Sequence, residues 1–363
     1  MTHKNKLTIV IFAGLIVAHA SRAEQLDRLS ADQLEVLAPS SRVAGPPGQM
    51  RVTERSCRAP TEVGLRRRIV DIAVQEWAYF GFGVVDETNR VDSERPQRRT
   101  RRRTPWLNPE ESARVAETIA GYWSITSDGS WILSRQNAVW NGQDGVASRW
   151  RDPWSAAFIS WVMCESGLGD VVRFRLAIAH HTYIDQAIEA RDSQAADAAF
   201  VAYDIGETPV APGDLLCSGR RPVYRSLAER RRELGTGIRS HCDIVIEVDA
   251  ANERILVIGG NVRGAVSLKL LPAAFGQNRG VELAIQSVGR GRRAAFAHLK
   301  LRADPIQANA LETSPTIRTF GQQQGALDWL RQRLRGQGSN RVEVVSTSAP
   351  PAGAALPGRP AAL

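Results

Sequence analysis

The sequence predicts an α+β domain, because segments with helical periodicity come first along the chain and segments with strand periodicity follow. After Pro212 the apolar residues alternate with polar ones at every second position, which is typical of strands with one buried face. The predicted strands follow one another with short turns between them, as antiparallel neighbours do. We therefore expect helices packed on an antiparallel sheet.

The helical segments are predicted in the first half of the chain. Residues 63–80 carry an apolar stripe at helical spacing. Residues 109–123 begin after the cap in the sequence NPEE, which also supplies a first-turn proline and two acids that complement the helix dipole. A further helix is expected to begin at Pro153, with Asp152 as its N-cap residue. Another is expected over about residues 172–200.

Strands are predicted in the second half of the chain, and a turn with the sequence DAAN separates the second strand from the third. A short amphipathic helix is expected after the strands, over residues 326–334. The predicted strands span residues 213–217, 241–248, 254–259, 265–270, 283–288 and 295–301.

The two ends of the chain differ from its middle. Residues 1–23 have the form of a secretory signal, with a basic start, an apolar run and small residues at a cleavage site. The apolar run is too short to cross a membrane, so we expect an exported protein without a transmembrane anchor, either periplasmic or secreted. We divide the rest into a linker at 24–62, a folded domain at 63–302, and an extension at 303–363 that ends in a disordered Pro/Ala-rich tail.

Composition limits the partners. The formal net charge is +9, and the segment from Arg95 to Arg103 is crowded with arginines. This segment is either a solvated loop or a contact for an anionic envelope polymer. No nucleic-acid motif accompanies it, and the four cysteines do not have the spacing of a metal site. We therefore expect no nucleic-acid partner, no metal and no cofactor.

Ser155 is the first candidate for a catalytic residue. It lies in the first turn of the helix expected at Pro153, beside unpaired backbone N–H groups and the positive end of the helix dipole. A hydroxyl at this position can act as a nucleophile, or it can simply cap the helix.

His241 is the candidate base. Strand periodicity places it on the same face as Asp243, whereas the intervening Cys242 belongs to an apolar face that should meet the core. The base for a serine nucleophile must lie within about 3 Å of it and be oriented by a third group. Asp243 and Asn261 are both candidates for that third group, although Asn261 follows two glycines and can equally form a turn.

These motifs resemble, in chain order, those of the NlpC/P60 and CHAP cell-wall hydrolases. The resemblance spans about residues 63–300 and is especially close to the uncharacterised bacterial family DUF2272, which shares the variants WSAAF and HCDIV. The stretches that carry it are PWSAAF at 153–158, PGDLL at 212–216, SHCDIV at 240–245 and IGGN at 258–261.

The resemblance implies a papain-like fold and a hydrolase or amidase that acts on peptide or amide bonds of peptidoglycan or another envelope polymer. Ser155 stands where those enzymes have a nucleophilic cysteine, and Asp243 stands where they have a small residue. A serine hydroxyl is far less acidic than a thiol and must lose its proton during attack. Two hypotheses follow: a serine hydrolase that uses Ser155, His241 and either Asp243 or Asn261, and a binding module that keeps the groove without catalysis.

Three further residues are candidates for substrate contacts. Trp154, His181 and Tyr183 are expected to line the substrate cleft. The strands that carry Cys217 and Cys242 would lie side by side in such a fold, so we expect a disulfide between them in an exported protein. The linker cysteine, Cys57, can remain a free thiol, and Cys164 is expected in the core.

Overall fold

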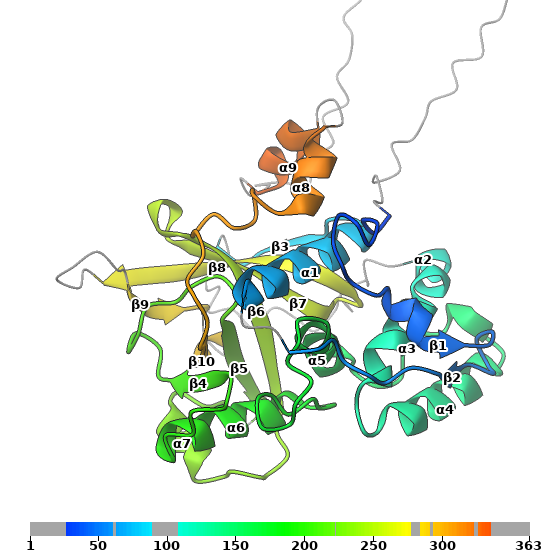
Figure 1. Cartoon of the computed structure of the whole chain (residues 1–363), viewed down its shortest axis with the longest axis horizontal. Coiled ribbons are helices and arrows are strands. Elements are labelled where there is room, and N and C mark those ends of the chain that lie inside the picture. Colours follow the sequence, from blue (N-terminus) through cyan, green and yellow to red (C-terminus); the bar gives the residue numbers. More distant parts are fainter. Residues whose placement is uncertain are drawn as a thin grey trace, which may run out of the picture.

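The computed structural model describes residues 27–60, 63–88, 108–221, 223–276, 284–290, 293–322 and 326–334, and it has an α+β architecture (Figure 1). The predicted signal region, the Arg95–Arg103 segment and the Pro/Ala-rich tail lie outside the described residues.

The main sheet is eight-stranded within the described residues, in the order β3-β8-β7-β6-β5-β10-β4, with β9 paired to β8. All six predicted strands are confirmed, but the sheet is mixed because β3 runs parallel to β8. The strands are β3 (Val84–Asp86), β4 (Phe200–Tyr203), β5 (Leu215–Arg221), β6 (Arg239–Asp249), β7 (Arg254–Val262), β8 (Ala265–Gly276), β9 (Ala284–Val288) and β10 (Ala295–Leu301).

The helices largely precede the sheet in sequence, as predicted, and the two-stranded ribbon of β1 (Val43–Ala44) and β2 (Arg51–Val52) lies beside α3 and α4 (Figure 1). The α-helices are α1 (Leu65–Tyr79), α2 (Pro109–Arg114), α3 (Ala116–Ser124), α4 (Gly129–Trp140), α5 (Ser155–Glu165), α6 (His180–Asp192), α7 (Leu227–Arg231), α8 (Pro315–Gly321) and α9 (Ala326–Leu334). The short 3-10 helices are η1 (Pro39–Arg42), η2 (Gly145–Ala147) and η3 (Ala250–Asn252).

The helix predicted over residues 172–200 is much shorter in the structure. The side chain of Gln186, on α6, accepts a hydrogen bond from the backbone N–H of Arg175 and donates to the carbonyl groups of Val171 and Val172. These bonds satisfy the backbone of the preceding segment in a loop conformation, so it does not need to be helical. At the other end the helix stops before Gln194, which has a left-handed backbone with φ of 55°.

The core lies on both faces of the sheet. Helix α5 is apolar on nearly every side and is buried against β6 and β7. Ile244 and Ile246 of β6 face this helical layer, while Val245 joins a second apolar cluster on the other face. Regular alternation along β6 would place Val248 on the same face as Ile244. Val248 packs with Val245 instead, because a β-bulge between Val245 and Glu247 shifts the alternation of side chains.

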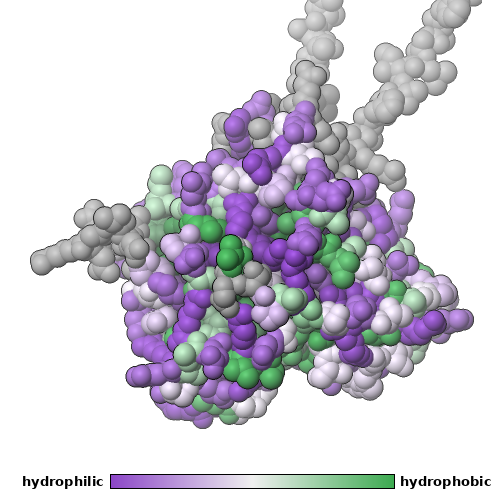
Figure 2. Space-filling model, viewed as in Figure 1, coloured by the Kyte–Doolittle hydropathy of each residue, from purple (hydrophilic) through white to green (hydrophobic). Residues whose placement is uncertain are grey.

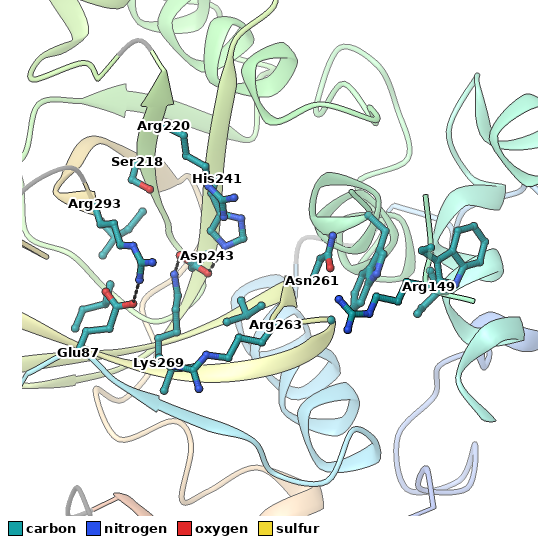
Figure 3. A pocket seen from close by; sticks show the side chains of 18 of the residues that line it. Glu87, Arg149, Ser218, Arg220, His241, Asp243, Asn261, Arg263, Lys269 and Arg293 are labelled. Atoms are coloured by element: carbon teal, nitrogen blue, oxygen red, sulfur yellow. Dashed lines mark hydrogen bonds and ion pairs between the residues drawn. The ribbon is translucent and has the colours of Figure 1, made fainter. Parts of the chain in front are cut away.

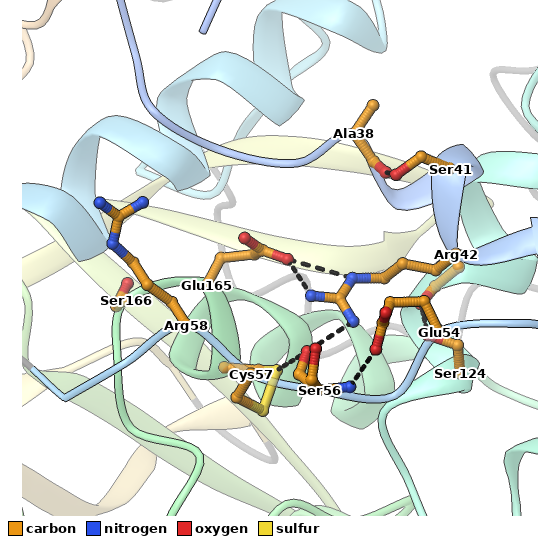
Figure 4. A network of polar contacts seen from close by, with 12 residues as sticks. Ala38, Ser41, Arg42, Glu54, Ser56, Cys57, Arg58, Ser124, Glu165 and Ser166 are labelled. Atoms are coloured by element: carbon orange, nitrogen blue, oxygen red, sulfur yellow. Dashed lines mark hydrogen bonds and ion pairs between the residues drawn. A yellow bond between two sulfur atoms is a disulfide. The ribbon is translucent and has the colours of Figure 1, made fainter.

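The N-terminal segment expected to be a linker is tied to the end of α5 (Figure 4). The buried Arg42 guanidinium forms an ion pair with Glu165 and donates from Nη1 to the carbonyl of Ser56 at 2.9 Å. Next to this contact, Cys57 forms a disulfide with Cys164. The expectation that Cys57 can be free is therefore wrong: the sequence places the two cysteines 107 residues apart, and only the folded path of the segment brings them together.

The predicted bond between Cys217 and Cys242 is confirmed, since these residues are paired neighbours on β5 and β6. Two disulfides are typical of a protein that matures in an oxidising compartment. No helix within the described residues is long and apolar enough to span a membrane. On the face shown in Figure 2, apolar groups are scattered among hydrophilic ones.

Candidate functional site

Ser155 is the first residue of α5, and the helix starts two residues later than the sequence predicts. Trp154 occupies the N-cap position, and Asp152, the expected cap, instead faces Arg135 at 3.6 Å. The side chain of Trp154 does not cap the helix. The first-turn backbone N–H groups of α5 therefore lie next to the Ser155 hydroxyl without a hydrogen bond from an N-cap side chain.

The hydroxyl of Ser155 is bound to a histidine other than the predicted one. Its Oγ lies 2.7 Å from Nε2 of His180, the first residue of α6. The other ring nitrogen of His180, Nδ1, accepts hydrogen bonds from the Tyr183 hydroxyl and, at 3.3 Å, from the backbone N–H of Cys242. That N–H is available because β7 pairs with β6 only from Ile244 onward.

This network assigns the proton of His180. A backbone amide is always a donor, so Nδ1 must present its lone pair, and the neutral ring carries its proton on Nε2. His180 then donates to Ser155, and the hydroxyl proton of Ser155 remains available to another acceptor. Burial, together with the nearby His241, holds the pKa of His180 well below its usual 6.5, so the ring is neutral at pH 7.

His241 belongs to a second chain of polar contacts, drawn in Figure 3. Its Nε2 donates to Oδ1 of Asp243 at 2.9 Å, and Lys269 of β8 forms an ion pair with Oδ2. Burial alone would raise the pKa of Asp243, but His241 and Lys269 outweigh it and hold that pKa well below its ordinary value. Burial lowers the pKa of His241, which is therefore neutral, with its lone pair on Nδ1.

The two chains of contacts meet at the histidine rings. The ring centroids of His180 and His241 are 5.2 Å apart, and Nδ1 of His241 has no hydrogen-bond partner within the described part of the chain. The structure thus brings Ser155, His180, His241 and Asp243 together, but the hydrogen bond predicted from Ser155 to His241 is made to His180 instead.

The sequence GGN near the end of β7 combines two glycines that allow close packing with an asparagine in a left-handed conformation. A Cβ on Gly259 would lie 2.0 Å from Oδ1 of Asp243, so only glycine leaves room for the His241–Asp243 pair. A Cβ on Gly260 would lie 2.6 Å from that of Phe158, so this glycine lets α5 approach the strand. Asn261 has a left-handed backbone with φ of 54°, a conformation that asparagine tolerates well.

A cavity of about 640 Å³ opens on the sheet face that carries His241 and Asp243 (Figure 3). Asn261 and the predicted cleft residue Trp154 also line it. Ser155 is not among the described residues that line it. Asn261 therefore shares the cavity with His241, but Asp243 is the residue bonded to the imidazole.

The other two predicted cleft residues lie elsewhere. His181 borders a separate shallow pocket with Gly237, Ile238 and Arg239. Tyr183 is buried, and its hydroxyl binds His180. Among the described residues, no cluster of three or more His, Cys, Asp or Glu side chains is arranged to hold a metal ion.

His180 and Lys269 are the site residues that the sequence did not assign. His180 is adjacent to His181, and the sequence left both open as ordinary helix residues or as residues that line the cleft. Lys269 could have been found, because a lysine inside the apolar run AVSLKLL must place its charge next to a partner or a solvent-filled space.

Comparison with protein families places the chain in the DUF2272 family, described as an uncharacterized protein conserved in bacteria, over residues 110–301. The matched region contains Ser155, His180, His241 and Asp243. Comparison with curated proteins and with solved structures finds no match.

Proposed function

We propose that this protein is an exported hydrolase of papain-like architecture that cleaves peptide or amide bonds in the cell envelope, with Ser155 as nucleophile and His241 as base. One observation carries the proposal: His241 is neutral, is oriented by Asp243 through one nitrogen, and leaves the other nitrogen open beside the Ser155–His180 pair. The order of the motifs, which resembles that of NlpC/P60 and CHAP enzymes, supports the same reaction class.

In the proposed reaction, Ser155 Oγ attacks the carbonyl carbon while its proton passes to Nδ1 of His241. Asp243 stabilises the imidazolium that forms, and Lys269 keeps Asp243 ionised. His180 is a positioning residue, because its Nε2–H fixes the orientation of Oγ. Backbone N–H groups in the first turn of α5 stabilise the oxyanion, and His241 returns the proton to the leaving amine as the C–N bond breaks. A water molecule that loses its proton to His241 then attacks the acyl-enzyme, and the proton returns to Ser155 Oγ as the carboxylic acid product leaves.

The proposal is tested by incubating the purified mature protein with peptidoglycan and identifying the released fragments by mass spectrometry. We expect release by the wild type and by Ser193→Ala, a control at an exposed serine after α6. Ser155→Ala and His241→Gln should release nothing above background. Equal release by Ser155→Ala and the wild type would overturn the assignment of the nucleophile.

A second candidate function is a binding module without catalysis. It is favoured by one observation: Ser155 accepts a hydrogen bond from His180 and does not line the cavity among the described residues. In that case the protein binds cell-wall fragments but forms no cleavage product. Ser155→Cys separates the two candidates, because a thiol at this helix start should react with alkylating agents in both, yet should support turnover only in a hydrolase.

A further inference from the structure

The cavity beside His241 carries an excess of positive charge. Five cationic side chains line it against two carboxylates, and they come from separate parts of the chain (Figure 3). The cations are Arg149, Arg220, Arg263, Lys269 and Arg293, and the carboxylates are Glu87 and Asp243.

Both carboxylates are already paired. Lys269 binds Asp243, and Nη1 of Arg293 lies 2.7 Å from Glu87. Arg149 and Arg220 form no close ion pair with a carboxylate among the described residues, although Asp243 acts on Arg220 at longer range, and both arginines are exposed. Arg220 lies beside His241, whereas Arg149 lies beyond Asn261, so the two guanidinium groups mark different ends of the cavity (Figure 3).

The rest of the lining mixes apolar and aromatic side chains with neutral polar ones, which are Ser112, Ser148, Ser218 and Asn261. Trp150 and Trp154 line the cavity, and Leu216 and Leu271 line it from the sheet. A volume of about 640 Å³ is in the range of pockets that enclose a small ligand. Walls of mixed apolar and small polar side chains, with cations at both ends, suit a short chain that has small side chains and separate negative charges.

We infer that this cavity binds a short acidic peptide, with one carboxylate held by Arg220 near His241 and another held by Arg149 at the far end. A guanidinium group binds a carboxylate through two parallel hydrogen bonds, which gives it both strength and orientation. This inference rests on the proposed function, since it names the substrate class of the same site. It places the acidic end of the substrate next to the base.

Calorimetric titration of the mature Ser155→Ala protein tests the inference without turnover. The probe is acetyl-Ala-Glu-Ala-Glu with a free C-terminus, and its neutral match is acetyl-Ala-Gln-Ala-Gln amide. We expect the acidic peptide to bind at least about tenfold more tightly than the neutral one. Arg220→Gln and Arg149→Gln should each weaken acidic binding by about tenfold. The control Arg232→Gln, an exposed arginine outside the cavity, should leave it unchanged.

Equal binding of the two peptides, or equal effects of Arg220→Gln and Arg232→Gln, would overturn the inference. Inorganic phosphate that binds as tightly as the acidic peptide would also overturn it, because the cavity would then be a general oxyanion site. These outcomes are distinct from failure of the proposed function: tight acidic binding by a wild type that forms no product refutes only the hydrolase, and turnover without charge preference refutes only the acidic peptide.

Discussion

Two histidine–aspartate pairs lie in the same sheet, and they have nearly the same internal geometry. The distance from Nε2 to the carboxylate is 2.9 Å for His241 and Asp243 and 2.8 Å for His298 and Asp214. Each aspartate also binds a cation, which is Lys269 in the first pair and Arg66 in the second. The pairs differ in what surrounds them.

Both carboxylate oxygens of Asp214 accept hydrogen bonds. It accepts hydrogen bonds from Arg66, His298 and the backbone N–H groups of Ala211 and Leu301, and so joins α1, β5 and β10. Burial opposes its ionisation, but the bonds from His298 and Arg66 outweigh burial and lower the pKa of Asp214. His298 is fully buried, and its Nδ1 meets no polar partner among the described residues.

The pair of His241 and Asp243 is also fixed by hydrogen bonds and an ion pair, but it lines the cavity. His241 lines the cavity, its ring lies 5.2 Å from that of His180, and its Nδ1 has no hydrogen-bond partner among the described residues. The comparison teaches that a histidine–aspartate contact is not by itself a sign of chemistry. An accessible second ring nitrogen separates a potential base from a structural anchor.

The largest expected effect comes from removing the charge of Asp243. Asp243→Asn should lower kcat by about 10³–10⁴-fold, because the amide no longer stabilises an imidazolium at His241. Initial rates on the released-fragment assay measure the loss. The control is Asp249→Asn at the other end of β6, outside the cavity lining, which should keep most of the activity. Full activity in Asp243→Asn would remove the basis for calling this pair functional.

Loss of the other pair, Asp214 and His298, should lower stability. Asp214→Ala leaves Arg66 buried without its partner, and we expect a loss of about 3–5 kcal/mol in the free energy of unfolding. Denaturant titration of the full chain measures this loss. A variant as stable as the wild type would contradict the role of Asp214 as an anchor.

The two disulfides should also differ in what their removal changes, because only one of them lies next to the site. Removing the Cys217–Cys242 bond with two serines should cost about 3 kcal/mol of stability for a separation of 25 residues. It should also lower kcat of the folded protein by about tenfold, because the disulfide fixes the backbone at Cys242, whose N–H orients His180. Removing Cys57–Cys164, which ties the N-terminal segment to the far end of α5, should lower stability alone. Equal kcat in the two double variants would contradict this division.

A third carboxylate, Glu247 of β6, tests how burial acts without a dominant cation. Burial and the charges of Glu312 and Asp249 raise its pKa from 4.5 to about 7. Between about pH 4.5 and pH 7, the folded state therefore keeps a proton that the unfolded state has lost. The contribution of Glu247 to the free energy of unfolding is greatest below about pH 4.5 and is lost as the pH rises through about 7. Glu247→Gln should be about 2 kcal/mol more stable than the wild type at pH 8 and nearly equal to it at pH 4.5. Thermal unfolding across this range measures the difference, with the exposed Asp328→Asn as control. A constant offset at all pH values would refute the raised pKa.

The sequence was most informative where local periodicity decides the structure. The strands around His241 and the face shared with Asp243 followed from alternation, until the bulge at Ile246 moved Val248 to the other face. A bulge depends on the partner strand, and so a single strand cannot reveal it. For the same reason the parallel strand β3 and the disulfide of Cys57 could not be predicted.

The site was predicted in part. Ser155, His241 and Asp243 were named from their motif, but the bond from Ser155 to His180 depends on a loop that delays the start of α6 until His180 and on a gap in the β6–β7 ladder. Neither feature leaves a local pattern in the sequence. Nearly all of the cavity's cations also come from separate strands and loops, and only the fold brings them together.

The most direct test of the account is the protonation state of the two site histidines, measured by nitrogen-15 NMR of the labelled full chain at pH 7. We predict that His180 and His241 are both neutral with the proton on Nε2, so that Nδ1 of His241 is the open base. A proton on Nδ1 of His241 would contradict the account. So would a proton on Nδ1 of His180, because the acceptor facing Ser155 would then be His180 and not His241.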